Sequence, residues 1–522
     1  MKGQKRESME EEKEEERRSE RQRRERAERA ERRDVLRARP CGCVGSSSLS
    51  SSSADDYKDI ISNLPDCLLT HILSFLPTRA SVATSILSSR WRSLWKLVPV
   101  LDLDQRLLFS RSDTDYPGPT RTNSNFSFWD TVSNIWTLRN AIPLRKLHLH
   151  GTSNCDSFLV STWVQDTLLR GGLQELDLFI FTDTNTPLEM PTTLFFCSTL
   201  VFLRLTGAIL LNPPASASTF PRLRILGLEN VRYAKHDSIS TLLAACPVLQ
   251  DFSLSVASYN FHGLDDSMVN VIVLVPTLKT LDIQWPVDDC WLYKLRINTP
   301  ALERFHFFGG LGEYVVLENL SNLVETIIEL EDDYSNTVDE IKKIWDFMES
   351  LYNVVSMKFN LGTAEILCYG PMDGLPMFNN LTSLTFNGNI WPSRYMWPAV
   401  KLLLCQAPKL QALGFELTSL GNHNYCPPDH YLEYRMQKMD YVPECLSSHL
   451  TTCYYKGFSG HEVEMELVRQ VLKEAYMLKT MNITFEIRLD SEIKLHACKK
   501  LRKLQRRYPT CQIEFDKGQF NF

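Results

Sequence analysis

The residues of this chain that could carry out chemistry are few and widely separated. His148 and His150 flank a leucine on a strand-like segment, and we expect both side chains to face solvent. Gly309–Gly310 is followed by no phosphate-binding lysine, and the acidic run 329–333 lacks the ligand spacing and the central glycine of a calcium loop. His71 is interpreted as an exposed side chain. The sequence therefore predicts no catalytic, metal or cofactor site, and a chain that is not an enzyme.

Composition is typical of a soluble protein from a reducing compartment. Hydrophobic residues make up 43% and charged residues 23% of the 522 residues, and the net charge of −6 argues against nucleic acid as the default partner. The 14 cysteines are scattered, mostly within apolar segments, as buried free thiols would be. The charged N-terminus is unlike a secretory signal, and no apolar run reaches the ~20 residues of a membrane-spanning helix. We therefore expect a nuclear or cytoplasmic protein that contacts no membrane.

The first 56 residues are predicted to be a disordered extension. Residues 1–39 contain 15 Lys/Arg and 12 Asp/Glu and no aromatic residue, so they cannot bury enough apolar area to offset the entropy of ordering. Residues 46–53 are rich in serine and indicate a flexible linker. Basic stretches such as 21–24 leave open a nuclear-import or RNA-binding tail, although a solvated extension is the simpler interpretation.

Three short helices are predicted next. Apolar residues at 68, 69, 72, 73 and 76 form the stripe of an amphipathic helix, which Pro65 can begin and Pro77 ends. A second helix is expected at about 78–87, and a third follows a capping serine, Ser88 or Ser89. Three short helices make a poor core of their own, so we expect this module to expose apolar surface to a partner.

The run from Asn63–Leu64–Pro65 to Ser93–Leu94–Trp95 closely resembles the F-box of plant F-box proteins, including both prolines, the leucine stripe and the Arg90–Trp91 pair. The resemblance assigns 57–104 to an F-box and implies that it binds the Skp-type adaptor of a cullin-RING ubiquitin ligase. The implied adaptor-binding residues are Leu64, Pro65, Leu68, Ile72, Leu76, Pro77, Val82, Trp91 and Leu94. Leu69, Leu73 and Leu87 are instead expected to pack inside the module.

A repeat occupies residues 140–439, after a connecting segment at 105–139. The pattern Leu-x-x-Leu-x-Leu recurs in eleven copies that begin 21 to 31 residues apart, close to the period of leucine-rich repeats. The last two apolar residues of a copy are two apart, so they point to the same face of a strand. Stacked copies bury that face only against their neighbours, which predicts a curved solenoid. Helical return segments are expected at 240–246 and 400–406. The copies begin at Leu144, Leu173, Leu200, Leu223, Leu249, Leu278, Leu302, Leu323, Val354, Leu381 and Leu410.

The C-terminal part, 440–518, has its own order of elements. A helix is expected at 462–475, a strand around 478–485, a helix at 495–507 and a closing strand at 511–516. This arrangement resembles the FBD domain that ends many plant F-box proteins with leucine-rich repeats, and it would cap the open end of the solenoid. The predicted fold is thus α/β: a three-helix F-box, a curved leucine-rich-repeat solenoid and an FBD-type segment.

The resemblance to the plant F-box/FBD/leucine-rich-repeat family implies a substrate-recognition subunit of an SCF-type cullin-RING E3 ubiquitin ligase. Its repeats would bind a substrate protein whose identity the sequence does not give. Three alternatives remain open. The chain could be a repeat scaffold that does not engage a ligase, a small-molecule co-receptor that holds ligand and substrate on its concave surface, or an RNA-associated adaptor that acts through its basic tail.

Overall fold

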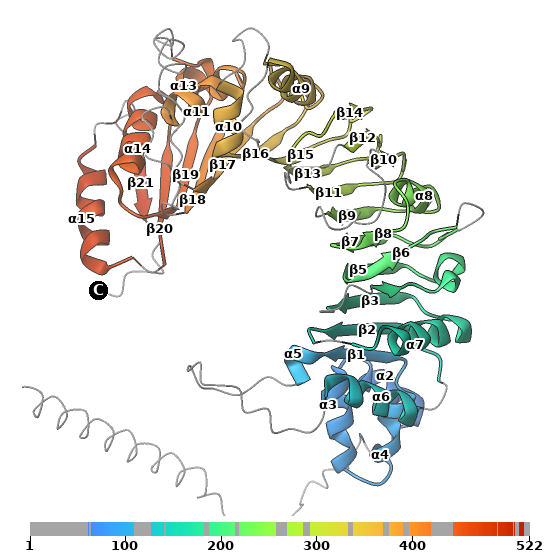
Figure 1. Ribbon diagram of the computed structural model, residues 1–522. Helices are drawn as coiled ribbons and strands as arrows, with labels where there is room; N and C mark the ends of the chain where they lie inside the picture. Colours follow the sequence, from blue (N-terminus) through green and yellow to red (C-terminus); the bar gives the residue numbers. More distant parts are fainter. Residues whose placement is uncertain are drawn as a thin grey trace, which may run out of the picture. The chain divides into compact units, whose positions relative to one another are not determined.

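The computed structural model divides the chain into two units, residues 1–63 and residues 64–522. The expected N-terminal extension, 1–56, lies outside the described residues, and all helices and strands given below belong to the second unit (Figure 1). The structure describes residue 61 and residues 64–108, 127–139, 142–153, 155–181, 187–214, 219–256, 269–285, 293–331, 338–368, 375–389, 396–418, 442–487, 489–504, 506 and 511–515.

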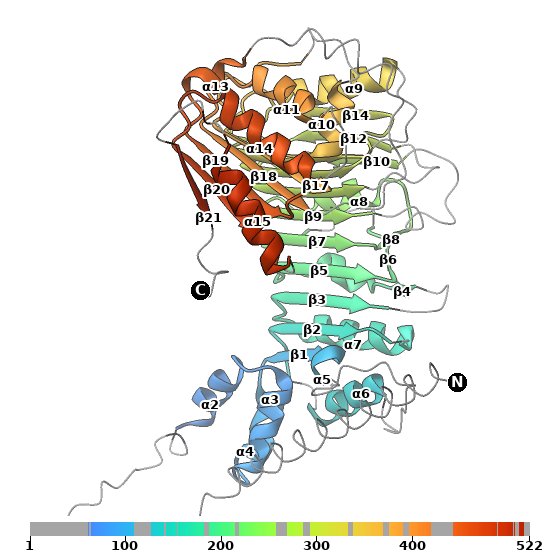
Figure 2. The same ribbon diagram turned by 90° about the vertical axis from the view of Figure 1, so that its left-hand side faces the viewer.

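A single parallel sheet of fifteen strands, the main sheet, runs through the second unit (Figure 2). Its strands follow one another in chain order, except that six short strands are left out of it. The strands, in order, are β1 Val100–Asp104, β2 Lys146–Gly151, β3 Glu175–Ile180, β5 Phe202–Gly207, β7 Ile225–Glu229, β9 Asp251–Ser255, β11 Thr280–Trp285, β13 Arg304–Gly309, β15 Glu325–Leu330, β16 Ser356–Asn360, β17 Ser383–Asn389, β18 Ala412–Thr418, β19 Thr452–Phe458, β20 Thr480–Phe485 and β21 Gln512–Phe515.

All eleven predicted repeat copies form strands of the main sheet, from β2 to β18. The pattern sets the register: Leu147 pairs with Leu176, Leu176 with Leu203, and Leu203 with Leu226. These side chains point inward and are buried, so each repeat closes its core only against its neighbours. Figure 1 shows the strands arranged along an arc with the helices on the outer side, as predicted. We call the side of the main sheet that points away from the helices the strand face.

The segments that return the chain between strands of the main sheet contain helices, strands or both. The two predicted helical returns are confirmed as α8 Ser238–Ala244 and α11 Met396–Cys405. Other returns contain α7 Ser157–Arg170, η3 Thr192–Phe196, α9 Val338–Glu349, α10 Leu361–Cys368 and α13 Glu444–Ser448. In the first two thirds of the array, returns also contain a strand. Two three-stranded parallel sheets form there, from β4 Leu188–Glu189, β6 Ile209–Leu211 and β8 Arg232–Tyr233, and from β10 Val269–Val273, β12 Tyr293–Asn298 and β14 Tyr314–Glu318. Strands β4 and β8 share their returns with η3 and α8.

The main sheet extends beyond the repeats at both ends. Before them lies β1, which the repeat pattern did not include, and after them come β19, β20 and β21 of the C-terminal segment. There the predicted helices are α14 Glu462–Glu474 and α15 Ser491–Arg502; the second begins and ends earlier than expected. The C-terminal segment therefore continues the sheet and its core. The connecting segment also has structure, with α5 Gln105–Leu108 and α6 Phe128–Arg139.

One hydrophobic core runs from Leu101 to Cys511. Five free cysteines, Cys246, Cys445, Cys453, Cys498 and Cys511, are buried, as the composition predicted for most of the cysteines. Burial raises the pKa of the Cys246 thiol to about 12. These cysteines therefore act as small apolar side chains.

Candidate functional site

The helical module predicted between residues 57 and 104 is present, with prolines at the start of its first two helices. It consists of α2 Asp66–Leu73, α3 Thr78–Ala83, η1 Thr84–Ile86, α4 Trp91–Leu94 and η2 Trp95–Leu97. Pro65 is the N-cap residue of α2 and Pro77 that of α3, where no backbone donor is lost. The expected serine cap of the third helix is wrong, because its N-cap residue is Arg90 and no side chain caps it.

The module has a small core of its own. Leu69 and Leu73 are buried in it, as predicted. Trp91 and Leu94 lie there too, with only 6% and 1% of their surface exposed. Their burial was not predicted, and their expected adaptor contact stays a prediction. They are the large apolar side chains that α4 packs against the inner side of α2, so they hold the module together and do not lie on its surface.

The outer side of the module is apolar. Leu68 and Ile72, one helical turn apart on α2, are 47% and 45% exposed. Phe75 and Leu76 lie in the turn that follows α2 and are 75% and 39% exposed; Phe75 was not among the predicted residues. We call these four residues the α2 stripe.

The other candidate residues of the module differ in how exposed they are. Pro65 and Pro77 are exposed, whereas Leu64 and Val82 are half-buried. The expected internal packing of Leu87 is wrong, since Leu87 is 62% exposed, next to Ile86 at 88%. Both follow or end η1, which is too short to turn them toward α2. Adaptor contact through the exposed residues stays a prediction.

Arg90 fixes the start of the α2 stripe. Its Nε and Nη2 atoms lie 2.9 and 2.6 Å from Oδ1 of Asp66, and Nη2 also donates to the carbonyl of Leu64. The arginine thus holds the first turn of α2 and the Leu64–Pro65 segment against α4. Because the Arg90 side chain is partly exposed, its ion pair with Asp66 adds little to the stability of the fold. Its main effect is to orient the first turn of α2.

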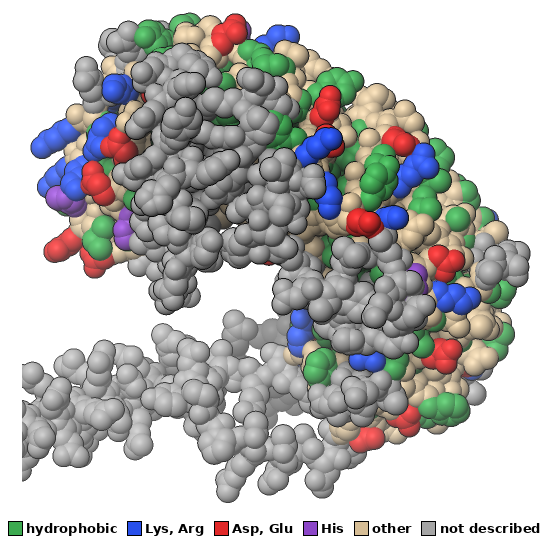
Figure 3. Space-filling model, turned by 45° about the horizontal axis from the view of Figure 1, so that its top comes forward, with side chains coloured by type: hydrophobic (Ala, Val, Ile, Leu, Met, Phe, Trp, Pro, Cys, Tyr) green, Lys and Arg blue, Asp and Glu red, His purple; other side chains and the backbone are tan. Residues whose placement is uncertain are grey.

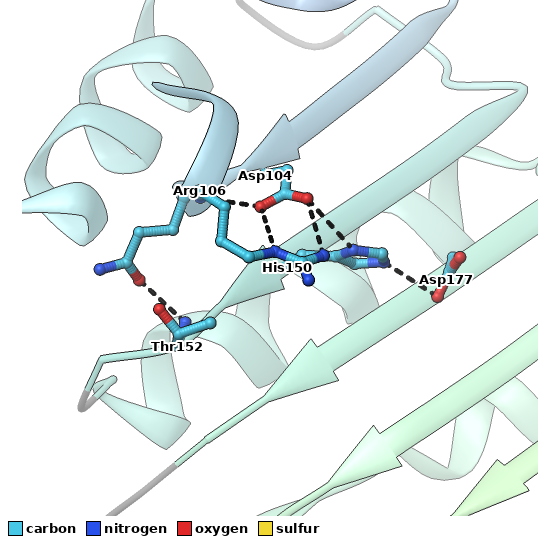
Figure 4. A network of polar contacts seen from close by, with 6 residues as sticks. Asp104, Arg106, His150, Thr152 and Asp177 are labelled. Carbon is cyan, nitrogen blue, oxygen red and sulfur yellow. Dashed lines mark hydrogen bonds and ion pairs between the residues drawn. The ribbon is translucent and has the colours of Figure 1, made fainter. Parts of the chain in front are cut away.

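Polar contacts join the end of the module to the first repeats (Figure 4). Strand β1 pairs in register with β2, from Val100 opposite Lys146 onward. Just after β1, Gln105 Oε1 accepts hydrogen bonds from the backbone N–H groups of Thr152 at 2.8 Å and of Ser153 at 3.1 Å. The module and the repeats are therefore joined by the pairing of β1 with β2 and by the hydrogen bonds of Gln105 at the edge of the sheet.

His150 lies between two carboxylates on the strand face (Figure 4). Its Nε2 is 3.1 Å from Asp177 Oδ1, and its Nδ1 is 3.9 Å from Asp104 Oδ2. Contact with Asp177 raises the pKa of His150, against the lowering effect of burial. Burial alone would raise the pKa of Asp104, but hydrogen bonds from Arg106 outweigh burial and lower it. The expectation that His150 faces solvent is therefore corrected, because its side chain is only 25% exposed.

A second histidine repeats this arrangement on the same face. His306 Nδ1 lies 3.2 Å from Asp282 Oδ1 on the adjacent strand, and this contact raises the pKa of His306 despite burial. His148 is also half-buried, with Nε2 3.8 Å from Glu175 Oε2. His71, by contrast, is exposed as expected and packs its ring against Phe75.

Farther along the strand face, the polar side chains are linked to one another. The Nζ atoms of Lys358 and Lys456 donate hydrogen bonds to the two carboxylate oxygens of Glu416, each at 2.6 Å. The two lysines lower the pKa of Glu416 although burial opposes them. Glu329, expected in a solvated loop, lies on β15 and accepts a hydrogen bond from Asn387 at 2.6 Å. Residues 332 and 333 of that acidic run lie outside the described residues.

The ring of Tyr454 lies on the same part of the strand face. The ring of Tyr454 crosses Gly414 of the neighbouring strand, where a Cβ atom would lie 2.3 Å from the ring carbon Cζ. Its hydroxyl reaches Thr385 Oγ1 at 2.8 Å, and the Lys456 ammonium is 5.2 Å from the ring centroid. Only glycine at 414 leaves room for this arrangement.

In the described ranges no group of three or more His, Cys, Asp or Glu side chains is placed to hold a metal ion. Of the helices that the structure describes, none combines the length and apolar character needed to cross a membrane.

Family models match three parts of the chain. An F-box domain model matches residues 61–103, and the model for the LRR repeats of FBD-associated F-box protein At5g56370 matches residues 160–313. An FBD model matches residues 437–483. The three matches have the same order along the chain as the module, the repeats and the C-terminal segment described above.

Relatives from Arabidopsis thaliana match over most of the chain. F-box/LRR-repeat protein At4g14103 is 31% identical over 371 residues, which are 69% of this chain and 92% of the relative. Probable FBD-associated F-box protein At1g32375 is 30% identical over 473 residues, 88% of this chain and 100% of the relative. F-box/FBD/LRR-repeat protein At4g26340 is 28% identical over 461 residues, 88% of this chain and 100% of the relative. The chain therefore belongs to the plant F-box/FBD/LRR-repeat protein family.

Proposed function

We propose that this chain is the substrate-recognition subunit of an SCF-type cullin-RING E3 ubiquitin ligase. The module at 64–104 docks on a Skp-type adaptor, and the strand face holds a substrate protein. The chain supplies no reacting group in this proposal. It raises the effective concentration of substrate beside a ubiquitin-charged enzyme, so catalysis is by proximity.

One observation carries the proposal: the module exposes apolar side chains although it has a closed core. Leu69 and Leu73 already fill the inner side of α2, so the α2 stripe is not needed for internal packing. Large apolar side chains grouped on a helix surface are typical of a protein interface. The match of residues 61–103 to an F-box model supports an adaptor as the partner.

The attachment of the module supports the second half of the proposal. Because β1 is the first strand of the main sheet, the module cannot turn freely against the repeats. A substrate bound on the strand face would then be held at a fixed distance and angle from the adaptor. Such fixed geometry raises the effective concentration more than a flexible tether does.

The test is co-purification with a Skp-type adaptor and its cullin. Wild-type protein should retain the adaptor, and Leu68→Ala/Ile72→Ala should weaken binding at least tenfold, since buried apolar anchors dominate such interfaces. The matched control is Phe158→Ala/Leu169→Ala, which truncates two exposed apolar residues of α7. It should bind as wild type does. Equal binding by both variants would contradict the docking proposal, and wild type without adaptor or cullin would favour a scaffold that engages no ligase.

We also propose that the protein acts in the nucleus or the cytoplasm, where a cullin-RING ligase would meet it. A fluorescent fusion of the full chain tests this location. Exclusive signal from another compartment would contradict it.

A further inference from the structure

The charges on the strand face are unevenly distributed along the main sheet. On the nine strands from β1 to β15, the outward positions carry nine Asp or Glu side chains: two each on β1, β3 and β15, and one each on β7, β9 and β11. The same positions carry three Lys or Arg side chains, Lys146, Arg204 and Arg304. Nine less three leaves an excess of six negative charges, with histidine counted as neutral. The six strands from β16 to β21 carry Glu416, Glu514, Lys358 and Lys456, and so have no excess.

Some of these nine carboxylates have a partner: Asp104 lies 2.9 Å from Arg106, Asp177 lies 3.1 Å from His150, and Asp282 lies 3.2 Å from His306. Lys146 pairs with Glu175 at 2.5 Å, but the guanidinium of Arg304 donates to Thr280, and that of Arg204 lies over the ring of Phe202. Within the described part of the chain, Glu229, Asp251 and Glu325 form no ion pair. On the face of the molecule that Figure 3 draws, acidic and basic side chains are interspersed.

Aromatic rings lie among the carboxylates. Phe179, Phe202 and Phe308 occupy outward positions on β3, β5 and β13 and are half-buried, so each presents part of its ring. A ring beside a carboxylate suits a lysine or arginine, whose apolar stem packs on the ring while its charge meets the acid. The chain itself contains one such contact between a guanidinium group and a ring, because the Arg204 guanidinium carbon lies 5.5 Å from the centroid of Phe202.

We infer that the strand face from β1 to β15 binds a segment of the substrate that is rich in lysine or arginine. This inference rests on the proposed function and names the chemical class of its substrate. The occupant is a protein segment, because the face spans nine strands and carries three aromatic rings among its carboxylates. Attraction between opposite charges would speed the encounter and set the direction in which the segment lies.

The probe is a short fluorescent peptide of alternating Lys and Ser, compared with its Glu/Ser counterpart, binding to the full chain. The face variant is Glu229→Lys/Asp251→Lys/Glu325→Lys. The matched control, Glu189→Lys/Glu313→Lys/Glu349→Lys, changes the net charge equally at exposed acids that are not on the strand face. We expect wild type to prefer the Lys/Ser peptide, the face variant to bind it about tenfold more weakly, and the control to bind as wild type does. A milder variant, Glu229→Gln/Asp251→Asn/Glu325→Gln, should show a smaller loss in the same direction if the lysine variant folds poorly.

Three results would overturn the inference: no preference for the Lys/Ser peptide, preference for the Glu/Ser peptide, or equal losses in the face and control variants. The last would mean that only net charge matters. Adaptor co-purification is measured on the same preparations. If all variants retain the adaptor while the peptide preference is absent, the substrate class is wrong and the ligase role stands. If wild type binds the Lys/Ser peptide through this face but no adaptor, the ligase role is wrong instead.

Discussion

The guanidinium of Arg139 donates hydrogen bonds to the main-chain carbonyls of Val98, at 2.5 Å, and of Trp95, at 3.5 Å. Arg139 ends α6, whereas Trp95 is the first residue of η2 and Val98 follows the last one. The side chain is only 5% exposed, and burial lowers its pKa to about 10. It is therefore still charged at neutral pH, and it joins the F-box to α6, the last helix before the repeats.

Replacing Arg139 with Met should loosen that junction. The carbonyls of Val98 and Trp95 would lose their charged donor while remaining buried, which lowers the free energy of unfolding by about 1–3 kcal/mol. Hydrogen exchange should speed up locally in β1, and thermal denaturation should show a lower midpoint. Arg139→Lys keeps the charge but not the fork of donors, so an intermediate effect is expected. Unchanged exchange in β1 for Arg139→Met would contradict the assigned role.

The repeats could be predicted from the sequence because their signal is local and repeated. Leu147 and Leu149 show the strand period within three residues, and the same pattern recurs along the chain. The return strands were missed for the opposite reason. Strand β10 pairs with β12, and β12 pairs with β14, so these strands are defined by contacts between different repeats and nothing local separates β10 from an apolar loop.

The candidate site was predictable only in part. Spacing identified the exposed apolar residues of α2, but it could not say which face of so short a helix as α4 turns inward, so the burial of Trp91 and Leu94 was not predicted. The contacts of His150 depend on strands brought together by folding. Register places His148, and not His150, directly opposite Asp177, so even a correct alignment of repeats would have suggested the wrong partner.

His150 should make stability depend on pH. Its pKa is raised in the folded state above the ordinary value of 6.5, chiefly by Asp177. Protonated His150 therefore stabilises the fold fully below about pH 6.5, and this contribution is lost as pH rises through the raised folded pKa. The stability difference between wild type and His150→Gln, measured by urea unfolding, should be larger near pH 6 than near pH 9. The exposed His496→Gln serves as control, and an equal difference at both pH values would contradict the contact with Asp177.

Gly414 and Tyr454 should be energetically coupled. In Gly414→Ala the new methyl group displaces the tyrosine ring, which then loses its hydrogen bond to Thr385. We expect a loss of about 1 kcal/mol in the free energy of unfolding. In a Tyr454→Ala background the same change should cost much less, because no ring crosses the glycine. A double-mutant cycle measures this coupling, and additive effects would show that the ring lies elsewhere in solution.

Glu464 should be the most sensitive polar residue of the C-terminal segment. It is fully buried and accepts hydrogen bonds from the backbone and hydroxyl of Ser459, from the backbone of His461 and from the hydroxyl of Tyr455. The contact to His461 forms a capping box at the start of α14, and the others tie that helix to β19 and to the turn that follows it. The Glu464 carboxylate thus accepts hydrogen bonds from four donors, and no neutral side chain of the same shape can accept all four.

In Glu464→Gln the amide nitrogen replaces an acceptor by a donor and meets donors that then have no partner. Because the site is buried, the free energy of unfolding should fall by about 1–3 kcal/mol or more. Glu466→Gln on the same helix is the control: its carboxylate is 44% exposed, and the loss there should stay within about 0.5 kcal/mol. Thermal denaturation with hydrogen exchange in β19 and β20 measures both variants. Since those strands share the main sheet with the last repeat, loss of protection spreading from them into β18 would show that the FBD segment seals the end of the solenoid.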